Sequence, residues 1–206
     1  MAKRKQSMLK YALPVGLLVA FGYATRKKSG STSNGSDTND TGYGTNYDLS
    51  NLTVTGSSYD NTPDNDTELD NIAYTSRMMD EVVTLIGYKP YVNSAYRSDA
   101  VNDDVGGVKT SYHLTGLAVD MNIGKSSQSD ADEKLRILQL LWDSDLPLDE
   151  VIAYAVNSDG TNNPDGKSHI HLSFAKSGTG DREFLTTVSG SSGTFSTWTP
   201  DTFSNS

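Results

Sequence analysis

The chain has 206 residues, which is enough for one domain of ordinary size with additional segments. The first 28 residues hold seven basic residues and no acidic one, so the other 178 carry 10 basic against 26 acidic residues, a formal balance of −16. A body this acidic repels phosphate backbones, which argues against nucleic acid as a partner. The absence of cysteine excludes disulfides, thiol nucleophiles and cysteine-ligated zinc, so a metal site would have to use His, Asp and Glu.

The N-terminus has the pattern of a targeting segment. Residues 11–25 contain no charge and lie between two basic clusters. Fifteen residues are short of the roughly 20 that a spanning helix needs, but snorkelling of flanking basic side chains extends their reach. Residues 1–28 are therefore expected to be a membrane anchor or a cleaved secretory signal. The anchor is preferred, because basic residues directly follow the candidate cleavage site at 22–24.

The two segments that flank the predicted domain are rich in small polar residues. Residues 29–65 contain mostly Ser, Thr, Asn, Gly and Asp, and such a composition predicts a flexible tether. An alternative is that its Tyr residues and the Leu-Thr-Val at 52–54 form a short ordered patch. Residues 186–206 have a similar Ser/Thr-rich composition and are expected to be a tail, which leaves 66–185 as the folded domain.

Apolar spacing within 66–185 predicts alternating helices and strands in chain order. The predicted elements are helices over 66–86 and 130–143 and strands over 91–98, 117–123, 150–155 and 169–174. Asp66 or Thr67 is the expected cap at the start of the first helix, and Gly87 is expected to end it. A polar loop is expected around 105–107. The predicted fold class is α+β, a small antiparallel sheet with flanking helices.

All three histidines, His113, His169 and His171, fall in the predicted domain. His169 and His171 are two residues apart on a predicted strand, so both should point to the same face. His113 lies seven residues before Asp120, which interrupts an apolar strand, and two explanations are open: a buried hydrogen-bonded pair, or two ligands of a metal. Two histidines and a carboxylate would leave a fourth position for water, the arrangement of a hydrolytic zinc site.

A longer pattern surrounds these residues. The motif S-x-H-x-x-G-x-A-x-D is matched by Ser111, His113, Gly116, Ala118 and Asp120. With Tyr-Arg-Ser before it and His-Ile-His-Leu-Ser-Phe about fifty residues later, the stretch from about 66 to 175 resembles the M15 peptidases. That family comprises zinc D-Ala-D-Ala carboxypeptidases and L-alanyl-D-glutamate endopeptidases, some of them bacteriophage lysins, and its fold is shared with the hedgehog signalling domain. The resemblance implies a hedgehog- or DD-peptidase-like fold.

The resemblance also implies a ligand set. His113, Asp120 and His171 would bind Zn²⁺, Gly116 would allow the turn between the first two ligands, and Ser111 would orient His113.

Catalytic roles follow from the same resemblance. Arg97 would hold a substrate carboxylate or the developing oxyanion, and His169 would stabilise the tetrahedral intermediate. Many members have an acidic residue three positions before the last ligand, where this chain has Ser168, so Asp165 is expected to be the general base. Further candidates for the base are Asp149, Glu150 and Asp159.

The predicted function is that of a zinc metallopeptidase acting on the peptidoglycan stem peptide, next to a D-amino acid, at either D-Ala-D-Ala or L-Ala-D-Glu. Its localisation is expected to be membrane-anchored or exported, with the domain facing the cell wall, and a phage or virion source fits. The alternative is a non-catalytic zinc-binding module that recognises wall peptide or a protein partner.

Overall fold

The structure is a computed structural model that describes residues 42–123, 128–157, 160–162, 169–187 and 194–203. These residues belong to one compact unit of the chain, residues 39–206. The predicted anchor or signal segment lies outside the described residues, as do Asp159, Asp165 and Ser168. In the part of the chain that is described, no helix has both the length and the apolar character needed to cross a membrane.

The long helix α2 (Asp66–Ile86) has the predicted bounds. Its cap is Asn65, one residue before the predicted caps, and the Asn65 side chain accepts a hydrogen bond from the backbone N–H of Glu68. Acidic residues in its first turn interact favourably with the positive end of the helix dipole. Gly87 ends the helix with a left-handed conformation at φ 89°, which glycine adopts without a Cβ penalty.

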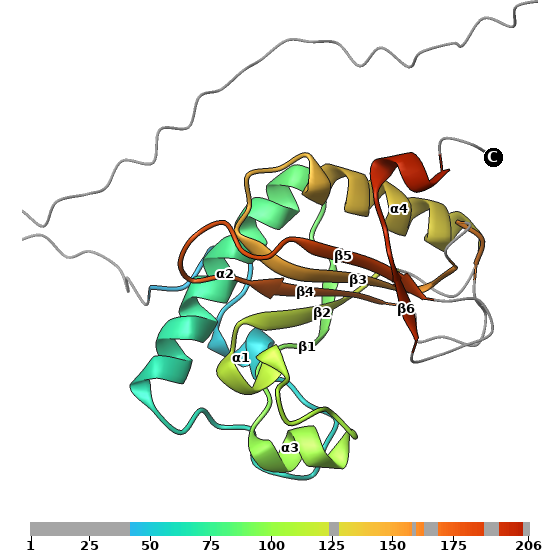
Figure 1. Cartoon of the computed structure of the whole chain (residues 1–206). Coiled ribbons are helices and arrows are strands. Elements are labelled where there is room, and N and C mark those ends of the chain that lie inside the picture. Colours follow the sequence, from blue (N-terminus) through green and yellow to red (C-terminus); the bar gives the residue numbers. More distant parts are fainter. Residues whose placement is uncertain (1–41, 124–127, 158–159, 163–168, 188–193, 204–206) are drawn as a thin grey trace, which may run out of the picture. The chain divides into compact units, whose positions relative to one another are not determined.

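Six strands form one sheet in the described part of the chain, in the order β1-β2-β4-β3-β5-β6 (Figure 1). The strands are β1 (Tyr91–Ser94), β2 (Ala118–Asn122), β3 (Leu148–Asn157), β4 (His169–Phe174), β5 (Glu183–Thr187) and β6 (Phe195–Thr197). The first four correspond to the four predicted strands, although β1 ends at Ser94, short of the predicted limit at 98. The sheet is mostly antiparallel, as predicted, but β3 and β5 pair in parallel. The domain is therefore mixed α+β.

The two faces of the sheet differ in chemistry because side chains alternate along each strand. Val119 and Met121 on β2, and Ile170 and Leu172 on β4, belong to the buried apolar core. Residues from α2 and from α4 (Gln128–Trp142) complete this core, and α4 contacts both α2 and β3. The residues in between, such as Asp120, face the other way and carry the polar groups described below.

The segment predicted as a tether is partly folded. Residues 42–65 are described, and α1 (Leu49–Leu52) lies within them, with Tyr47 and Leu52 buried in the core. The carboxylate of Asp80 on α2 accepts hydrogen bonds from the backbone of residues 45 and 46, which compensates for the small number of apolar side chains. The ordered patch is therefore the better description of 42–65, while 29–41 lies outside the described residues.

The segment predicted as a tail also contributes to the fold. It contains the end of β5, all of β6 and the short helix η2 (Pro200–Phe203). Trp198 is 2% exposed and contacts the rings of Trp142 and Phe184 edge-on and tilted, respectively. The domain thus extends beyond the predicted limit at 185, because one large aromatic side chain outweighs a polar neighbourhood.

Two short helices stand between β1 and β2. Helix α3 (Asp99–Asp104) begins at Ser98, whose side chain accepts from the backbone N–H of Val101. The 3₁₀ helix η1 (Tyr112–Thr115) follows it directly before β2. Figure 1 shows α3 near the β1 side of the sheet, away from α4. Both helices were missed in the polar loop that the sequence predicts.

Candidate metal centre

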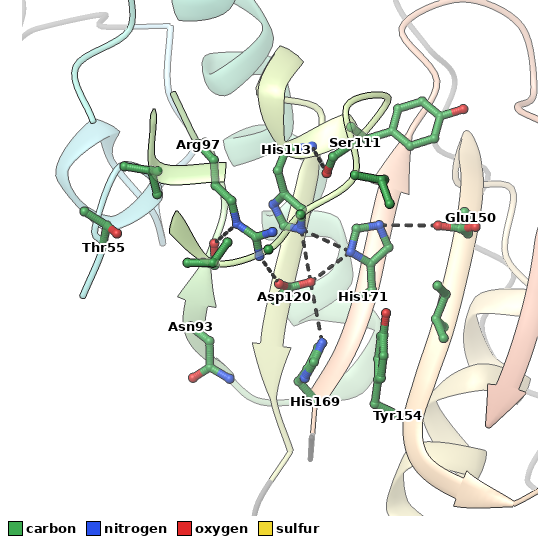
Figure 2. A pocket seen from close by; sticks show the side chains of 18 of the residues that line it. Thr55, Asn93, Arg97, Ser111, His113, Asp120, Glu150, Tyr154, His169 and His171 are labelled. Carbon is green, nitrogen blue, oxygen red and sulfur yellow. Dashed lines mark hydrogen bonds and ion pairs between the residues drawn. The ribbon is translucent and has the colours of Figure 1, made fainter. Parts of the chain in front are cut away.

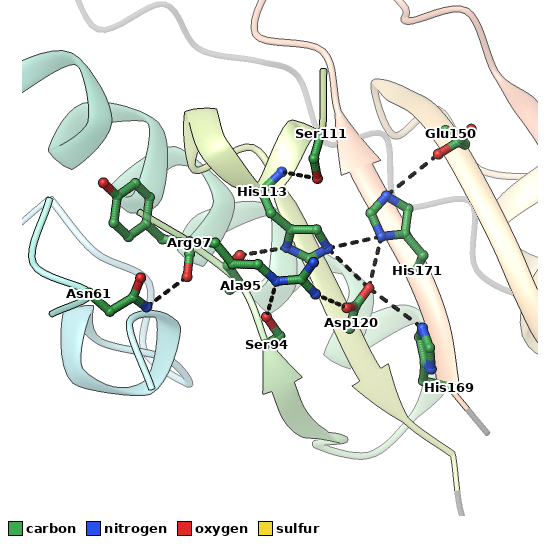
Figure 3. Close-up of polar contacts among 11 residues, drawn as sticks. Asn61, Ser94, Ala95, Arg97, Ser111, His113, Asp120, Glu150, His169 and His171 are labelled. Carbon is green, nitrogen blue, oxygen red and sulfur yellow. Dashed lines mark hydrogen bonds and ion pairs between the residues drawn. The ribbon is translucent and has the colours of Figure 1, made fainter. Parts of the chain in front are cut away.

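Three donor atoms converge on the polar face of the sheet. Oδ1 of Asp120 lies 2.8 Å from Nδ1 of His171 and 3.2 Å from Nε2 of His113, and the two ring nitrogens are 3.2 Å apart (Figure 3). All three residues are buried. The structure therefore brings together the three ligands predicted from the sequence.

Strand register places two of these donors. Asp120 on β2 pairs directly with His171 on β4 in the antiparallel ladder, so their side chains are cross-strand neighbours on the same face. The 50 residues between them in the chain include α4 and β3. The third donor, His113, comes from η1 immediately before β2.

Gly116 makes the turn from His113 into β2. It ends η1 with φ 76°, a conformation that side chains rarely adopt. A Cβ at this position would also lie 2.8 Å from Cγ1 of Ile72 on α2, closer than van der Waals contact. The predicted role of Gly116 in the turn between the two ligands agrees with this geometry.

His113 is fixed through both its ring and its backbone. Its Nδ1 lies 2.5 Å from the carbonyl oxygen of Ala95, which must accept the ring proton and so leaves a lone pair on Nε2. Ser111 accepts from the backbone N–H of His113 at 3.3 Å, and the His113 carbonyl accepts from the backbone N–H of Arg97. Ser111 thus orients His113 through the main chain.

Arg97 binds the other oxygen of the carboxylate. Its Nη2 donates to Oδ2 of Asp120 at 2.6 Å, and its Nε donates to Oγ of Ser94 at 2.8 Å. This ion pair turns Oδ1 of Asp120 toward the histidines. Asn61 braces the segment around Arg97, since its side chain donates to the carbonyl of Tyr96 and accepts from the N–H of Ser98.

His169 lies beside the cluster. Its Nε2 is 3.8 Å from Oδ1 of Asp120, longer than the contacts of the three convergent donors. The ring of Tyr154 stacks on it, with centroids 4.2 Å apart, and the ring of Phe195 meets Tyr154 edge-on. His169 and His171 share one face of β4, as their spacing predicts.

A cleft of about 1230 Å³ opens over these residues (Figure 2). The described residues that line it include the aromatic rings of Tyr154, His169 and Phe195 and the glycine- and valine-rich stretch at 105–108. Among the described residues that line it, the carboxylates are Asp120 and Glu150. Oε1 of Glu150 lies 3.6 Å from Nε2 of His171, on the opposite side of the ring from Asp120.

The other candidates for the base are placed differently. Asp149 accepts a hydrogen bond from the backbone N–H of Asp181 at 3.1 Å and is absent from the described lining of the cleft. Asp159 and Asp165 lie outside the described residues.

Burial and close contacts shift the pKa values of three groups at the site. Burial lowers the pKa of His113, which favours the neutral imidazole that a metal requires. Burial alone would raise the pKa of Asp120, but its close contacts with the imidazoles of His113 and His171 outweigh burial and hold that pKa well below its usual value. Burial also raises the pKa of Glu150. A neutral histidine and an ionised carboxylate form a suitable donor set.

The spacing of the donors fits a zinc ion. Ligands about 2.0–2.1 Å from a tetrahedral zinc are roughly 3.3 Å from one another. The three separations here are 2.8, 3.2 and 3.2 Å. Two imidazole nitrogens and one carboxylate oxygen are also the donors of many catalytic zinc sites, which keep a fourth position for water or substrate. The geometry favours a metal site over a simple hydrogen-bonded pair.

Several residues of the site escaped the sequence prediction. Tyr154 and Phe195 belong to no recognisable motif. Glu150, Ile152 and Tyr154 alternate along β3 and all line the cleft, but this common face is apparent only once the strand is known. Asn61 lies in a segment whose composition indicates a tether, and no sequence signal connects it with Arg97.

Comparison with known proteins agrees with this site. No curated protein matches the chain. The family model described as Peptidase M15 matches residues 45–140, which include His113 and Asp120, and its match begins in the segment that packs before α2. His171 lies beyond the matched range, and the pairing of β2 with β4 brings it to the other two ligands. Residues 45–140 therefore match a Peptidase M15 domain.

Proposed function

We propose that this protein is a zinc-dependent peptidoglycan peptidase that hydrolyses a stem-peptide bond next to a D-amino acid, D-Ala-D-Ala or L-Ala-D-Glu. The observation that carries the proposal is the convergence of His113, Asp120 and His171 at the floor of an open cleft, in a chain with an M15 domain. A hedgehog- or DD-peptidase-like arrangement of the α+β domain belongs to the same proposal.

The residues around the ligands have distinct roles in this proposal. His113, Asp120 and His171 would hold Zn²⁺, which would supply Lewis acidity and lower the pKa of a bound water. Arg97 keeps Asp120 oriented and lies in the cleft, where its guanidinium can also face a substrate oxygen. His169, whose ring stacks on that of Tyr154, would stabilise negative charge on the reacting carbonyl. Asp165 is the proposed general base.

The proposed location is outside the cytoplasmic membrane, with residues 11–25 as an anchor or export signal and the domain facing the cell wall. An acidic body with an uncharged N-terminal segment between basic clusters supports this arrangement. A phage or virion source is compatible with it.

Digestion of purified peptidoglycan, followed by mass spectrometry of the released peptides, tests the activity. We expect cleavage next to a D-amino acid that is abolished by a chelator, restored by zinc and absent in His113→Ala. Asp165→Ala should retain zinc and lose cleavage. Intact wall after incubation with zinc-loaded protein would refute the peptidase.

A second candidate is a non-catalytic zinc-binding module that recognises wall peptide. It is favoured by the position of the two carboxylates in the described cleft lining: Asp120 is part of the donor cluster, and Glu150 faces the outer nitrogen of His171. This candidate predicts stoichiometric zinc and binding of stem peptide with no cleavage in the same digestion.

A further inference from the structure

We propose that Glu150 is a positioning residue of the metal centre. Its carboxylate holds the outer ring nitrogen of His171, so that the inner nitrogen presents a lone pair to the metal. The inference rests on the zinc site of the proposed function, and it is independent of whether peptide is cleaved.

The two nitrogens of His171 face different partners. Nδ1 lies in the donor cluster, 2.8 Å from Oδ1 of Asp120 and 3.2 Å from Nε2 of His113. Nε2 points out of the cluster toward Oε1 of Glu150 at 3.6 Å, as Figure 3 shows. A neutral imidazole carries one proton, and a nitrogen that binds a metal cannot carry it. The proton of a metal-binding His171 must therefore be on Nε2, facing Glu150.

The sheet holds Glu150 in this place. Ile152 on β3 pairs with His171 on β4, and both Ile152 and Glu150 line the cleft, although the β3–β4 register shifts between Leu148 and Val151. Its backbone N–H donates to Oγ of Ser173 at 3.0 Å. Its side chain is 30% exposed. Glu150 is thus a constrained neighbour of the ring.

The two histidine ligands then have parallel support. The outer nitrogen of His113, Nδ1, lies 2.5 Å from the carbonyl oxygen of Ala95, and the outer nitrogen of His171 lies 3.6 Å from Oε1 of Glu150, an ion-pair distance longer than a direct hydrogen bond. An oxygen acceptor behind each ligating imidazole fixes its tautomer and ring orientation and raises its basicity. The same geometry argues against Glu150 as the general base, because its carboxylate faces the side of the ring turned away from the donors.

Zinc affinity of the full chain, measured by competition with a chromophoric chelator, tests this role. Glu150→Ala removes the acceptor and should weaken zinc binding by about 10- to 100-fold, the usual effect of losing such a partner. Glu150→Gln keeps an acceptor oxygen and should recover part of that loss.

Glu183 provides a matched control. It pairs with Glu150 in the β3–β5 register, carries the same charge and is exposed. Glu183→Ala should change zinc affinity by less than about fivefold, as expected for an exposed charge. Equal losses in Glu183→Ala and Glu150→Ala would mean that the effect is general electrostatics and would overturn the proposal.

Nitrogen NMR of histidine-labelled, zinc-loaded protein gives a second readout that a merely structural role would not change. We expect the wild-type His171 ring to be protonated at Nε2, with an N–H signal that exchanges faster with solvent in Glu150→Ala. Wild-type zinc affinity in Glu150→Ala, protonation of His171 at Nδ1, or a wild-type chain that binds no zinc would each overturn the proposal. A chain that binds zinc but leaves peptidoglycan intact would refute only the peptidase.

Discussion

Val119 and Met121 lie in the apolar core, whereas Asp120 between them lies on the opposite face of β2 with the histidines. The same contrast holds on β4, where His171 stands between Ile170 and Leu172. One pair of strands therefore supplies both the core that stabilises the domain and the donors of the site. Because adjacent side chains point in opposite directions, stability and metal binding should respond to different substitutions on the same strands.

Among substitutions on the face of the sheet that carries the donor atoms, loss of a metal ligand should have the largest effect. In His113→Ala, zinc affinity should fall by more than the roughly 10- to 100-fold that loss of an outer partner costs, and peptidoglycan cleavage should disappear. The midpoint of thermal unfolding of the metal-free protein should change little. Chelator competition and calorimetry on the same samples measure the two effects, and retained zinc affinity would contradict the assigned ligands.

A substitution on the core face should give the converse result. Leu172 is fully buried one residue after His171, and Leu172→Ala should lower the free energy of unfolding by about 2–5 kcal/mol. At denaturant concentrations below its unfolding midpoint, this variant should still bind one zinc. Denaturant titration and zinc analysis separate these outcomes, and loss of zinc from the folded variant would show that the two faces are coupled.

Replacing Lys134 on α4 should change the free energy of unfolding by less than Leu172→Ala does, and it should stabilise the domain. Its side chain has no exposed surface, and burial lowers its pKa to about 8, against about 10.5 in an unfolded chain. Below pH 8 both states bind the proton and the folded state carries the full penalty, whereas between pH 8 and 10.5 the unfolded chain binds more protons and stability rises.

Lys134→Met should therefore stabilise the domain at pH 7 by about 1–3 kcal/mol. Chemical denaturation from pH 7 to 10.5 checks this, since the difference between wild type and variant should shrink as the pH rises. A difference that stays constant with pH would show that the lysine is not the cause.

Substitutions of Tyr154, in the aromatic part of the cleft, should have the smallest effect. Tyr154→Phe keeps the ring that stacks on His169 and should preserve zinc affinity and nearly all cleavage. Tyr154→Ala removes an aromatic contact of about 0.5–1.5 kcal/mol and should reduce kcat/KM with little change in zinc affinity. If Tyr154→Phe were as impaired as Tyr154→Ala, the hydroxyl and not the stack would be the important group.

The sequence predicts the local parts of this molecule well. Helix α2 and strands β1 to β4 follow from apolar spacing, and His113 and Asp120 fall in one short motif because a single turn at Gly116 connects them. The position of Glu150 behind His171 depends on the register between β3 and β4, which arises from long-range packing that no local pattern records.

The ends of the domain were harder to predict for a different reason. Composition in the 42–65 segment is that of a tether, yet Tyr47 and Leu52 are buried and Asp80 binds the backbone of the segment. In the C-terminal segment, the buried Trp198 and the pairing of β6 with β5 anchor a Ser/Thr-rich stretch. A few specific contacts can order a polar segment when a formed core offers a place for them, and composition averages such contacts away.

The most direct test of the metal centre is X-ray absorption at the zinc edge of the loaded protein, compared between wild type and His171→Ala. We predict one zinc per chain with two imidazoles and only nitrogen or oxygen donors at about 2.0–2.1 Å, and one imidazole fewer in the variant. Substoichiometric zinc in the wild type, or an imidazole count unchanged by His171→Ala, would contradict the site of His113, Asp120 and His171.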